Sequence, residues 1–194
     1  GEFKEGDEVI VSGYDLGMNT SGGFAEFIRV PPEWAVALPK GLSQKNSMAL
    51  GTAGLTAGLS VEALDSFRGV KDTNSIVTGS SGGVGSISVM LLSQLGSQVT
   101  AVSGKVDQQN FLKDIGASSV ISRKELTELI KLPINKGLWD IGVDVVSGEI
   151  LSKLLAALNP GGAVACSGLV GGTLFKSSIL PFILRGIALL GKIG

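Results

Sequence analysis

The spacing of apolar and polar positions changes near residue 43, and this change divides the chain into two parts. Before it, short apolar runs at 8–11, 24–30 and 34–38 are separated by loops rich in glycine and proline, which predicts β-strands. Between 43 and 67, apolar residues recur at helical spacing behind Ser43, a residue suited to cap a helix. From Ser75 onward, nearly all-apolar runs alternate with amphipathic segments, as in parallel strands joined by helices.

This alternation predicts an α/β fold built on a doubly wound parallel sheet over residues 43–194. The strands are expected at 75–79, 98–103, 119–122, 139–145, 163–167 and 187–190. The connecting helices are expected at 83–95, 107–115, 124–131, 149–158 and 178–185. Residues 1–42 read as part of a β domain, because three strands are too few to close a sheet.

The first strand of this alternating region turns into a helix through a cluster of small residues. Its apolar run ends in Gly79-Ser80-Ser81-Gly82-Gly83-Val84-Gly85. Glycines permit a tight turn, the close approach of a diphosphate and close packing of the helix on its strand. The amides of the first helical turn and the helix dipole favour an anion. We therefore predict a dinucleotide-binding turn here.

Two dinucleotide-binding patterns fit this turn. Thr78 to Gly85 matches the T-G-x-x-x-G-x-G pattern of short-chain dehydrogenases and also G-x-x-G-x-x-G. Ser80 stands where the strict fingerprint has its first glycine. A short-chain dehydrogenase needs a downstream Tyr-x-x-x-Lys pair, but the only tyrosine, Tyr14, lies upstream. The sequence therefore argues against the first pattern.

The end of the second predicted strand indicates which cofactor the turn serves. An NAD site places an acidic residue there, on the ribose hydroxyls. This chain has Ser103-Gly104-Lys105 instead, and Arg123 follows the third strand. A hydroxyl, a free amide and two cations suit a 2′-phosphate, which a carboxylate would repel. We therefore predict NADPH as the cofactor.

Composition excludes several classes of function. The net charge of -1 and the absence of a basic run argue against nucleic acid as a partner. The most apolar stretch, from Ile179 to Leu190, is too short to span a membrane. With no histidine and only Cys166, the chain cannot build a usual zinc site or a nucleophile–histidine pair. The single cysteine, expected in a packing role, suits a reducing compartment, so a cytoplasmic location is expected.

Several stretches resemble the medium-chain dehydrogenase/reductase superfamily, in its zinc-free quinone oxidoreductase branch. The similarity is closest to the NADPH-dependent acryloyl-CoA reductase subgroup. The stretches that carry it are 22–27 (GGFAEF), 51–57 (GTAGLTA), 99–105 (VTAVSGK), 112–123 (from Leu112 to Arg123), 168–172 (GLVGG) and 181–186 (PFILRG). One departure is Val146-Ser147-Gly148, where relatives usually carry a diglycine.

The resemblance implies a GroES-like β domain, of which 1–42 is a part, around a Rossmann-like NADPH-binding domain at 43–194. It also implies the positions of the cofactor contacts. These are Gly82, Gly83, Val84 and Gly85 at the diphosphate, Ser103, Gly104, Lys105 and Arg123 at the 2′-phosphate, and Leu169 near the nicotinamide. No catalytic residue is assigned, because the cleft tyrosine of the family belongs to a segment before Gly1. We interpret the chain as a fragment of a longer protein, and we expect it to be inactive alone.

The function implied is NADPH-dependent reduction of an activated C=C bond, as in acryloyl-CoA, by hydride transfer to the β-carbon. A quinone or enone acceptor stays open, and so does a non-catalytic NADPH-binding or redox-sensing module. The apolar run before Lys192 lacks edge-protecting charges, so strand 188–193 is expected to pair with another chain. The resemblance implies a homodimer joined there.

Overall fold

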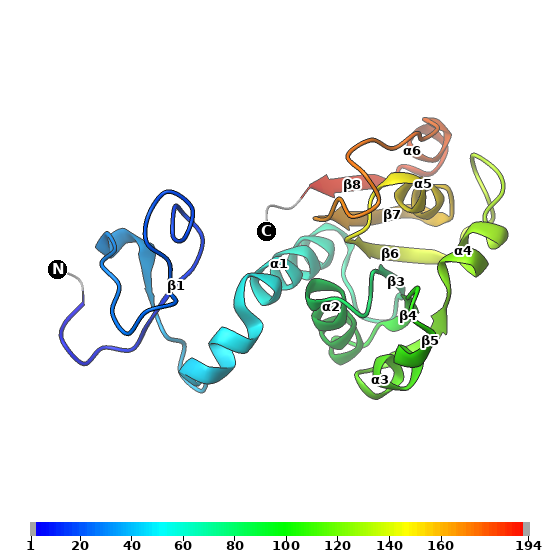
Figure 1. The fold of residues 1–194 in the computed structure, drawn as a ribbon. Coiled ribbons are helices and arrows are strands. Elements are labelled where there is room, and N and C mark those ends of the chain that lie inside the picture. The colour runs from blue at the N-terminus through cyan, green and yellow to red at the C-terminus, as the bar shows by residue number, and fades with distance from the viewer. Residues whose placement is uncertain (1–2, 192–194) are drawn as a thin grey trace. The chain divides into compact units, whose positions relative to one another are not determined.

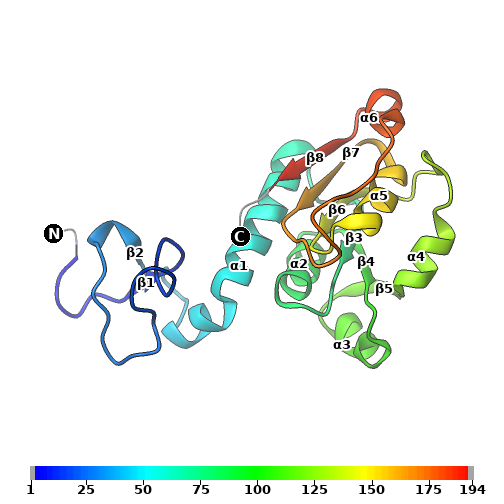
Figure 2. The same ribbon diagram turned by 45° about the horizontal axis from the view of Figure 1, so that its top comes forward.

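The computed structural model describes residues 3–191, and the chain divides after Thr52 into two compact units (Figures 1 and 2). Helix α1 (Gln44–Arg68) crosses this point and is kinked at Gly51, whose φ of 51° and ψ of -153° are not helical. Ser43 caps the helix as predicted, because its hydroxyl accepts a hydrogen bond from the amide of Asn46 at 3.1 Å. The assignment of residues 1–42 and 43–194 to two domains stays a prediction.

The first unit contains a short antiparallel pair of strands. β1 (Val9–Val11) pairs with β2 (Ala35–Ala37), which follows the 3₁₀ turn η1 (Pro32–Trp34). These strands confirm two of the three predicted there. The third prediction, a strand at 24–30, is wrong: this segment is irregular and leaves Phe27 89% exposed. An extended segment needs a neighbouring strand to satisfy its backbone, and none pairs with it among residues 3–191.

The second unit alternates strands and helices from Asn74 onward. Its strands are β3 (Asn74–Thr78), β4 (Gln98–Val102), β5 (Ala117–Ile121), β6 (Trp139–Asp144), β7 (Leu158–Cys166) and β8 (Ala188–Gly191). Its helices are α2 (Gly83–Gln94), the 3₁₀ turn η2 (Val106–Gln108), α3 (Gln109–Asp114), α4 (Arg123–Leu129), α5 (Gly148–Ala156) and α6 (Leu180–Arg185). Each of the predicted strands and helices in this region is present, with bounds shifted by a few residues.

All six strands form one parallel sheet in the order β5-β4-β3-β6-β7-β8. The chain builds outward from β3 in one direction and then returns to build from β6 in the other, so the two neighbours β3 and β6 mark the switch point. This is the strand order of a Rossmann fold. The predicted α/β fold with a doubly wound parallel sheet is confirmed.

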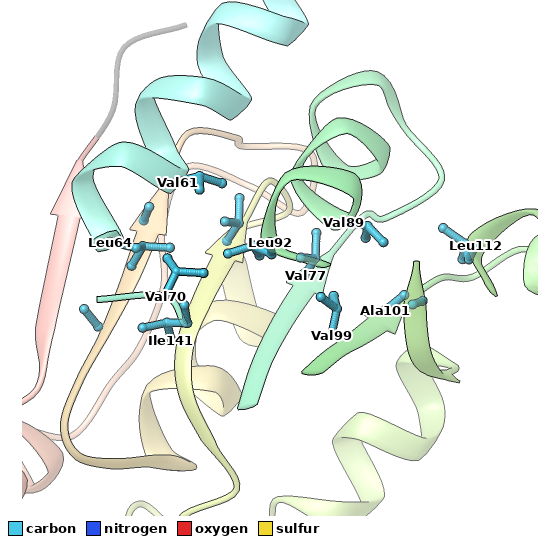
Figure 3. Close-up of a cluster of buried hydrophobic side chains, with 14 residues drawn as sticks. Val61, Leu64, Val70, Val77, Val89, Leu92, Val99, Ala101, Leu112 and Ile141 are labelled. Atoms are coloured by element: carbon cyan, nitrogen blue, oxygen red, sulfur yellow. The ribbon is translucent and has the colours of Figure 1, made fainter. Parts of the chain in front are cut away.

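Helices cover both faces of this sheet, and successive strand residues point to opposite faces. On one face, Val77 of β3 belongs to a cluster with Val61 and Leu64 of α1 and Leu92 of α2 (Figure 3). On the other, Ile76 of β3 belongs to a cluster with α4 and α5. Because both faces are buried, the centres of most strands are apolar, which agrees with the pattern that the sequence shows.

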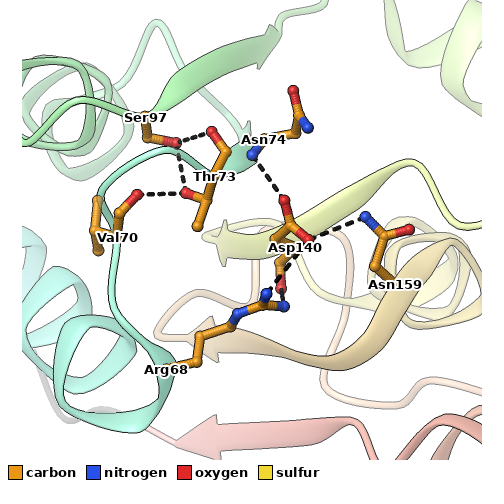
Figure 4. A network of polar contacts seen from close by, with 7 residues as sticks. All are labelled: Arg68, Val70, Thr73, Asn74, Ser97, Asp140 and Asn159. Carbon is orange, nitrogen blue, oxygen red and sulfur yellow. Dashed lines mark hydrogen bonds and ion pairs between the residues drawn. The ribbon is translucent and has the colours of Figure 1, made fainter.

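A polar network holds the end of the sheet where β3 and β6 begin (Figure 4). The Asp140 carboxylate accepts hydrogen bonds from the Asn74 amide at 2.9 Å and from Asn159 Nδ2 at 3.0 Å. It also forms an ion pair with Arg68 at 3.5 Å. These contacts join the end of α1 to β3, β6 and β7, far from the ends of the strands where ligands bind in such folds.

Strand β7 begins earlier than predicted, at Leu158 rather than 163. Leu158 pairs with Trp139, and the register then shifts before Ala163 pairs with Ile141, so the Pro-Gly-Gly segment forms an irregularity within one strand. The guanidinium of Arg185 donates to the Leu158 carbonyl at 2.7 Å and to the Asn135 carbonyl. This side chain therefore ties α6 to the start of β7. No helix among residues 3–191 is long and apolar enough to cross a membrane.

Candidate functional site

The turn between β3 and α2 has the close packing that its glycines predicted. Gly79 has a φ of +57°, and a Cβ there would lie 2.6 Å from Val145 Cγ2. A Cβ on Gly85 would overlap the carbonyl oxygen of Gly79 and lie 2.8 Å from Ser80 Cα. Since these neighbours are backbone atoms, the helix could not approach its strand with any larger residue at position 85.

Ser80 explains how a serine replaces the first glycine of the strict fingerprint. Its side chain is fully buried, and its hydroxyl lies 2.7 Å from the carbonyl oxygen of Val77 and 3.1 Å from that of Val102. The serine therefore bridges β3 and β4 beneath the turn. The N-cap of α2 is Gly82, which has no side chain to occupy the amides of the first turn. These amides remain available to an anion.

The ends of β4 and β5 come together on one side of this turn. Ser103 is buried, and its hydroxyl accepts a hydrogen bond from the Lys105 amide at 3.1 Å. Gly104 lies close to the Arg123 side chain, since a Cβ on Gly104 would lie 3.4 Å from Arg123 Nε. The side chain of Ser103 thus shapes the turn that presents Lys105. Neither Lys105 nor Arg123 belongs to an ion pair that the structure shows within residues 3–191.

The start of α4 fixes the backbone that carries Arg123. The Ser122 hydroxyl accepts from the Glu125 amide at 3.1 Å, and the Glu125 carboxylate accepts from the Ser122 amide at 2.6 Å. These reciprocal bonds form a capping box. The bonds from Ser122 favour the ionised carboxylate and lower the pKa of Glu125.

A buried carboxylate that the sequence reading missed lies below the switch point. Asp144 is fully buried, and its carboxylate accepts from Thr78 Oγ1 at 2.6 Å and from the Ser147 amide at 2.8 Å. The Cys166 sulfur lies 3.7 Å from the same carboxylate. Burial and the neighbouring Asp144 charge raise the pKa of the Cys166 thiol to about 11. One side chain therefore joins the carboxyl ends of β3, β6 and β7.

The end of β7 offers a hydroxyl to a ligand. A Cβ on Gly168 would overlap the carbonyl oxygen of Val145, so the chain after β7 passes directly over the end of β6. Ser167 Oγ is buried and has no hydrogen-bond partner within the part of the chain that the structure describes. A buried hydroxyl without a partner costs free energy unless a ligand or water satisfies it. Its position therefore fits a polar ligand at this end of the sheet.

These features line one cleft of about 410 Å³ at the carboxyl ends of the strands. The predicted contacts that line it are Gly82, Gly83, Val84, Gly85, Lys105 and Arg123. Ser103 and Gly104 adjoin it through Lys105, whereas Leu169 is 65% exposed and only its neighbours Gly168 and Val170 line the cleft. The role of each residue toward a cofactor stays a prediction. Even so, the glycine cradle, the two cations and the unpartnered Ser167 hydroxyl all fit a phosphorylated dinucleotide.

The strand order and the glycine turn at the switch point define a Rossmann domain of the dehydrogenase type. The family model described as zinc-binding dehydrogenase matches residues 83–194, and the chain belongs to this family, within the medium-chain dehydrogenase/reductase superfamily. No group of three potential metal-binding side chains from His, Cys, Asp and Glu occurs within residues 3–191.

Among curated proteins, the chain is 46% identical to "Probable acrylyl-CoA reductase AcuI" of Escherichia coli, over 97% of this chain and 58% of that protein. It is 44% identical to "Putative quinone oxidoreductase YhfP" of Bacillus subtilis, with the same coverage. The crystal structure of YhfP with NAD bound superposes with a TM-score of 0.93 over 98% of this chain and 58% of that one.

The YhdH oxidoreductase of Salmonella enterica in complex with NADP gives a TM-score of 0.92 at 46% identity. It too is matched over 98% of this chain and 58% of its own length. The chain thus spans little more than half the length of these relatives.

Proposed function

We propose that the whole protein is an NADPH-dependent reductase of an activated carbon–carbon double bond, with an enoyl thioester such as acryloyl-CoA as its substrate. The observation that carries this proposal is the cleft at the glycine turn, which Lys105 and Arg123 both line, with Ser103-Gly104-Lys105 in place of an acidic residue directly after β4. Its 46% identity to a protein named as an acrylyl-CoA reductase supports the substrate class.

The residues of this chain would hold and orient the cofactor. The first-turn amides of α2 would bind the diphosphate, and Lys105 with Arg123 would neutralise the 2′-phosphate. Ser167 lines the cleft beside Gly168, and its buried hydroxyl, which has no partner among the described residues, would serve a polar group of the cofactor. When bound, NADPH supplies the hydride for the β-carbon of the substrate. Hydrogen-bond donors for the thioester oxygen are not assigned to this chain.

The choice of cofactor can be tested by binding, without any turnover. NADPH fluorescence titrations of the chain should show weaker binding for Lys105→Ala and Arg123→Ala, by at least tenfold each, since each removes a charge-assisted contact of roughly 1.5–3 kcal/mol. Binding of NADH should not change. Lys124→Ala is the matched control, because the Lys124 side chain is 84% exposed, pairs with Glu128 and does not line the cleft. A preference of the unmodified chain for NADH would refute the 2′-phosphate assignment.

A quinone or enone acceptor is the second candidate, and the name of the relative YhfP supports it. Steady-state oxidation of NADPH by the whole protein, with acryloyl-CoA and with a panel of quinones, separates the two. A higher kcat/KM for acryloyl-CoA supports the thioester reductase. A protein that binds NADPH and turns over neither acceptor would instead be a non-catalytic NADPH-binding module.

We further propose that two copies pair through β8 and that the protein is cytoplasmic. β8 is the last strand of the sheet, and its side chains at 188–190 are apolar and only partly buried. An unpaired apolar edge strand favours pairing with a second chain. Residues 192 and 193 of the predicted interface lie outside the described residues. Light scattering of the whole protein that shows a monomer at high concentration would contradict the dimer. The cytoplasmic location is supported by the single cysteine, because a chain with one cysteine forms no internal disulfide and suits a reducing compartment.

A further inference from the structure

A second cavity in the second unit is separate from the cofactor cleft. It is a groove of about 590 Å³ between the segment after α4, the outer face of α5 and the segment before α6. No residue that lines this groove also lines the cofactor cleft. We call it the lysine groove, because Lys131, Lys153 and Lys176 lie on its three sides. Its volume lies in the range of small-molecule sites.

The charge of the lysine groove is positive. Its lining contains one acidic residue, Glu149, which forms an ion pair with Lys153 at 3.8 Å. Lys131 and Lys176 belong to none of the ion pairs formed among residues 3–191. Two lysines from separate segments thus line the groove without an ion-pair partner among the described residues, which favours an anionic ligand.

Besides three serines, the rest of the lining is apolar, and several of its apolar side chains are exposed. Leu174 is 87% exposed, Leu132 62% and Phe175 40%. Apolar surface that is gathered in a concave site, rather than scattered singly, marks a binding surface. A purely ionic ligand would leave these side chains in water, so the apolar lining selects a ligand that carries a hydrocarbon segment beside its charge.

We propose that the lysine groove binds a small amphiphilic anion, with a carboxylate or phosphate head between Lys131 and Lys176 and an aliphatic chain against Leu174 and Phe175. The ligand class follows from charge complementarity and from the apolar lining together. The groove adds a second ligand site to the domain, and it would exist whether or not the cleft binds NADPH.

The test is a calorimetric titration of the chain with sodium octanoate. One saturable site is expected, and each of Lys131→Gln and Lys176→Gln should weaken binding about fivefold, since each removes one exposed charge contact of roughly 1 kcal/mol. Octanamide, which lacks the charge, and acetate, which lacks the chain, should each bind at least tenfold more weakly. Lys124→Gln is the matched control outside the groove, and it should leave octanoate affinity unchanged.

Several outcomes would overturn the proposal. Equal binding of octanoate and octanamide would show apolar adsorption without a role for the lysines. Loss of affinity in Lys124→Gln equal to that in Lys176→Gln would show a general charge effect. If octanoate does not bind, and Leu174→Asp converts an oligomer into a monomer, the groove is a contact between copies. Competition between octanoate and NADPH would also refute it, because the two sites share no lining residue. If NADPH does not bind, the proposed function fails, but the octanoate titration still tests the lysine groove independently.

Discussion

Replacing Asp144 by asparagine tests whether one buried carboxylate organises the floor of the cofactor cleft. In the structure this side chain accepts from Thr78 Oγ1 at 2.6 Å and from the Ser147 amide at 2.8 Å. Thr78 Oγ1 in turn accepts from the Val145 amide at 3.1 Å. Asparagine has nearly the same shape but one acceptor oxygen. Its NH₂ group must therefore face one of the two donors.

The expected loss of stability follows from these bonds. A hydrogen bond to a charged group contributes about 1.5–3 kcal/mol, and asparagine replaces both bonds by neutral ones of about 0.5–1.5 kcal/mol at best, with its NH₂ group donating to Thr78 Oγ1. Asp144→Asn should therefore lower the free energy of unfolding by about 2–4 kcal/mol. For a domain of this size, Tm would fall by roughly 5–12 °C. The affinity for NADPH should fall at least fivefold, or about 1 kcal/mol, because Val145 and Ser147 adjoin the cleft.

Asp140→Asn is the matched control, since Asp140 occupies the other end of the same strand. Its carboxylate is bonded to Asn74 and Asn159, so this change should also destabilise the domain, by about 1–3 kcal/mol. It should leave NADPH affinity unchanged, because none of its partners lines the cleft. Urea unfolding gives the stabilities, and NADPH fluorescence gives the affinities. The reasoning fails if both variants weaken NADPH binding equally, or if Asp144→Asn is as stable as the parent.

Three further changes probe the same region. Ser147→Gly should stabilise the domain by about 1 kcal/mol. The reason is that Ser147 has a φ of 65° and a ψ of -159°, a conformation that suits glycine. A loss of stability in urea unfolding would refute this prediction. Stability should fall as pH rises from 9.0 toward 11, because folding raises the pKa of Cys166 from 9.0 to about 11 and only the unfolded thiol ionises there. The rate of Cys166 alkylation should rise over the same interval in the folded protein, and a constant rate would count against the raised pKa. Gly85→Ala should lower the free energy of unfolding by about 1–3 kcal/mol and the affinity for NADPH at least tenfold, since the added Cβ would overlap Gly79. An unchanged affinity would show that α2 can move away from β3.

The sequence by itself determined the local elements of the second unit and the place of its turn. Each strand is an apolar run bounded by polar or small residues, and each helix is amphipathic, so the period of the pattern identifies both. The glycines from Gly79 to Gly85 also identify the turn, because the conformations they permit are a local property of the backbone. The cations Lys105 and Arg123 could be found by their positions after consecutive strands, since parallel strands present their carboxyl ends to the same edge of the sheet.

The sequence reading failed where an outcome depends on neighbours that are distant in the chain. The apolar run at 24–30 has the pattern of a strand, but a strand exists only where another strand satisfies its backbone. Ser103 was predicted as a phosphate contact, which stays a prediction, and the structure adds that its hydroxyl accepts from the Lys105 amide. A hydroxyl can serve several partners, and the sequence cannot rank them.

Tertiary structure alone decided which buried polar groups meet. Thr78 and Asp144 are 66 residues apart and are brought within 2.6 Å because the sheet places β3 beside β6. The same order of strands lays the segment after β7 over the end of β6 and leaves Ser167 Oγ without a partner. The lysine groove likewise takes its three charges from three separate segments. Periodicity reports which face of an element is buried, whereas the identity of the neighbour is set by strand order, which is a property of the whole chain.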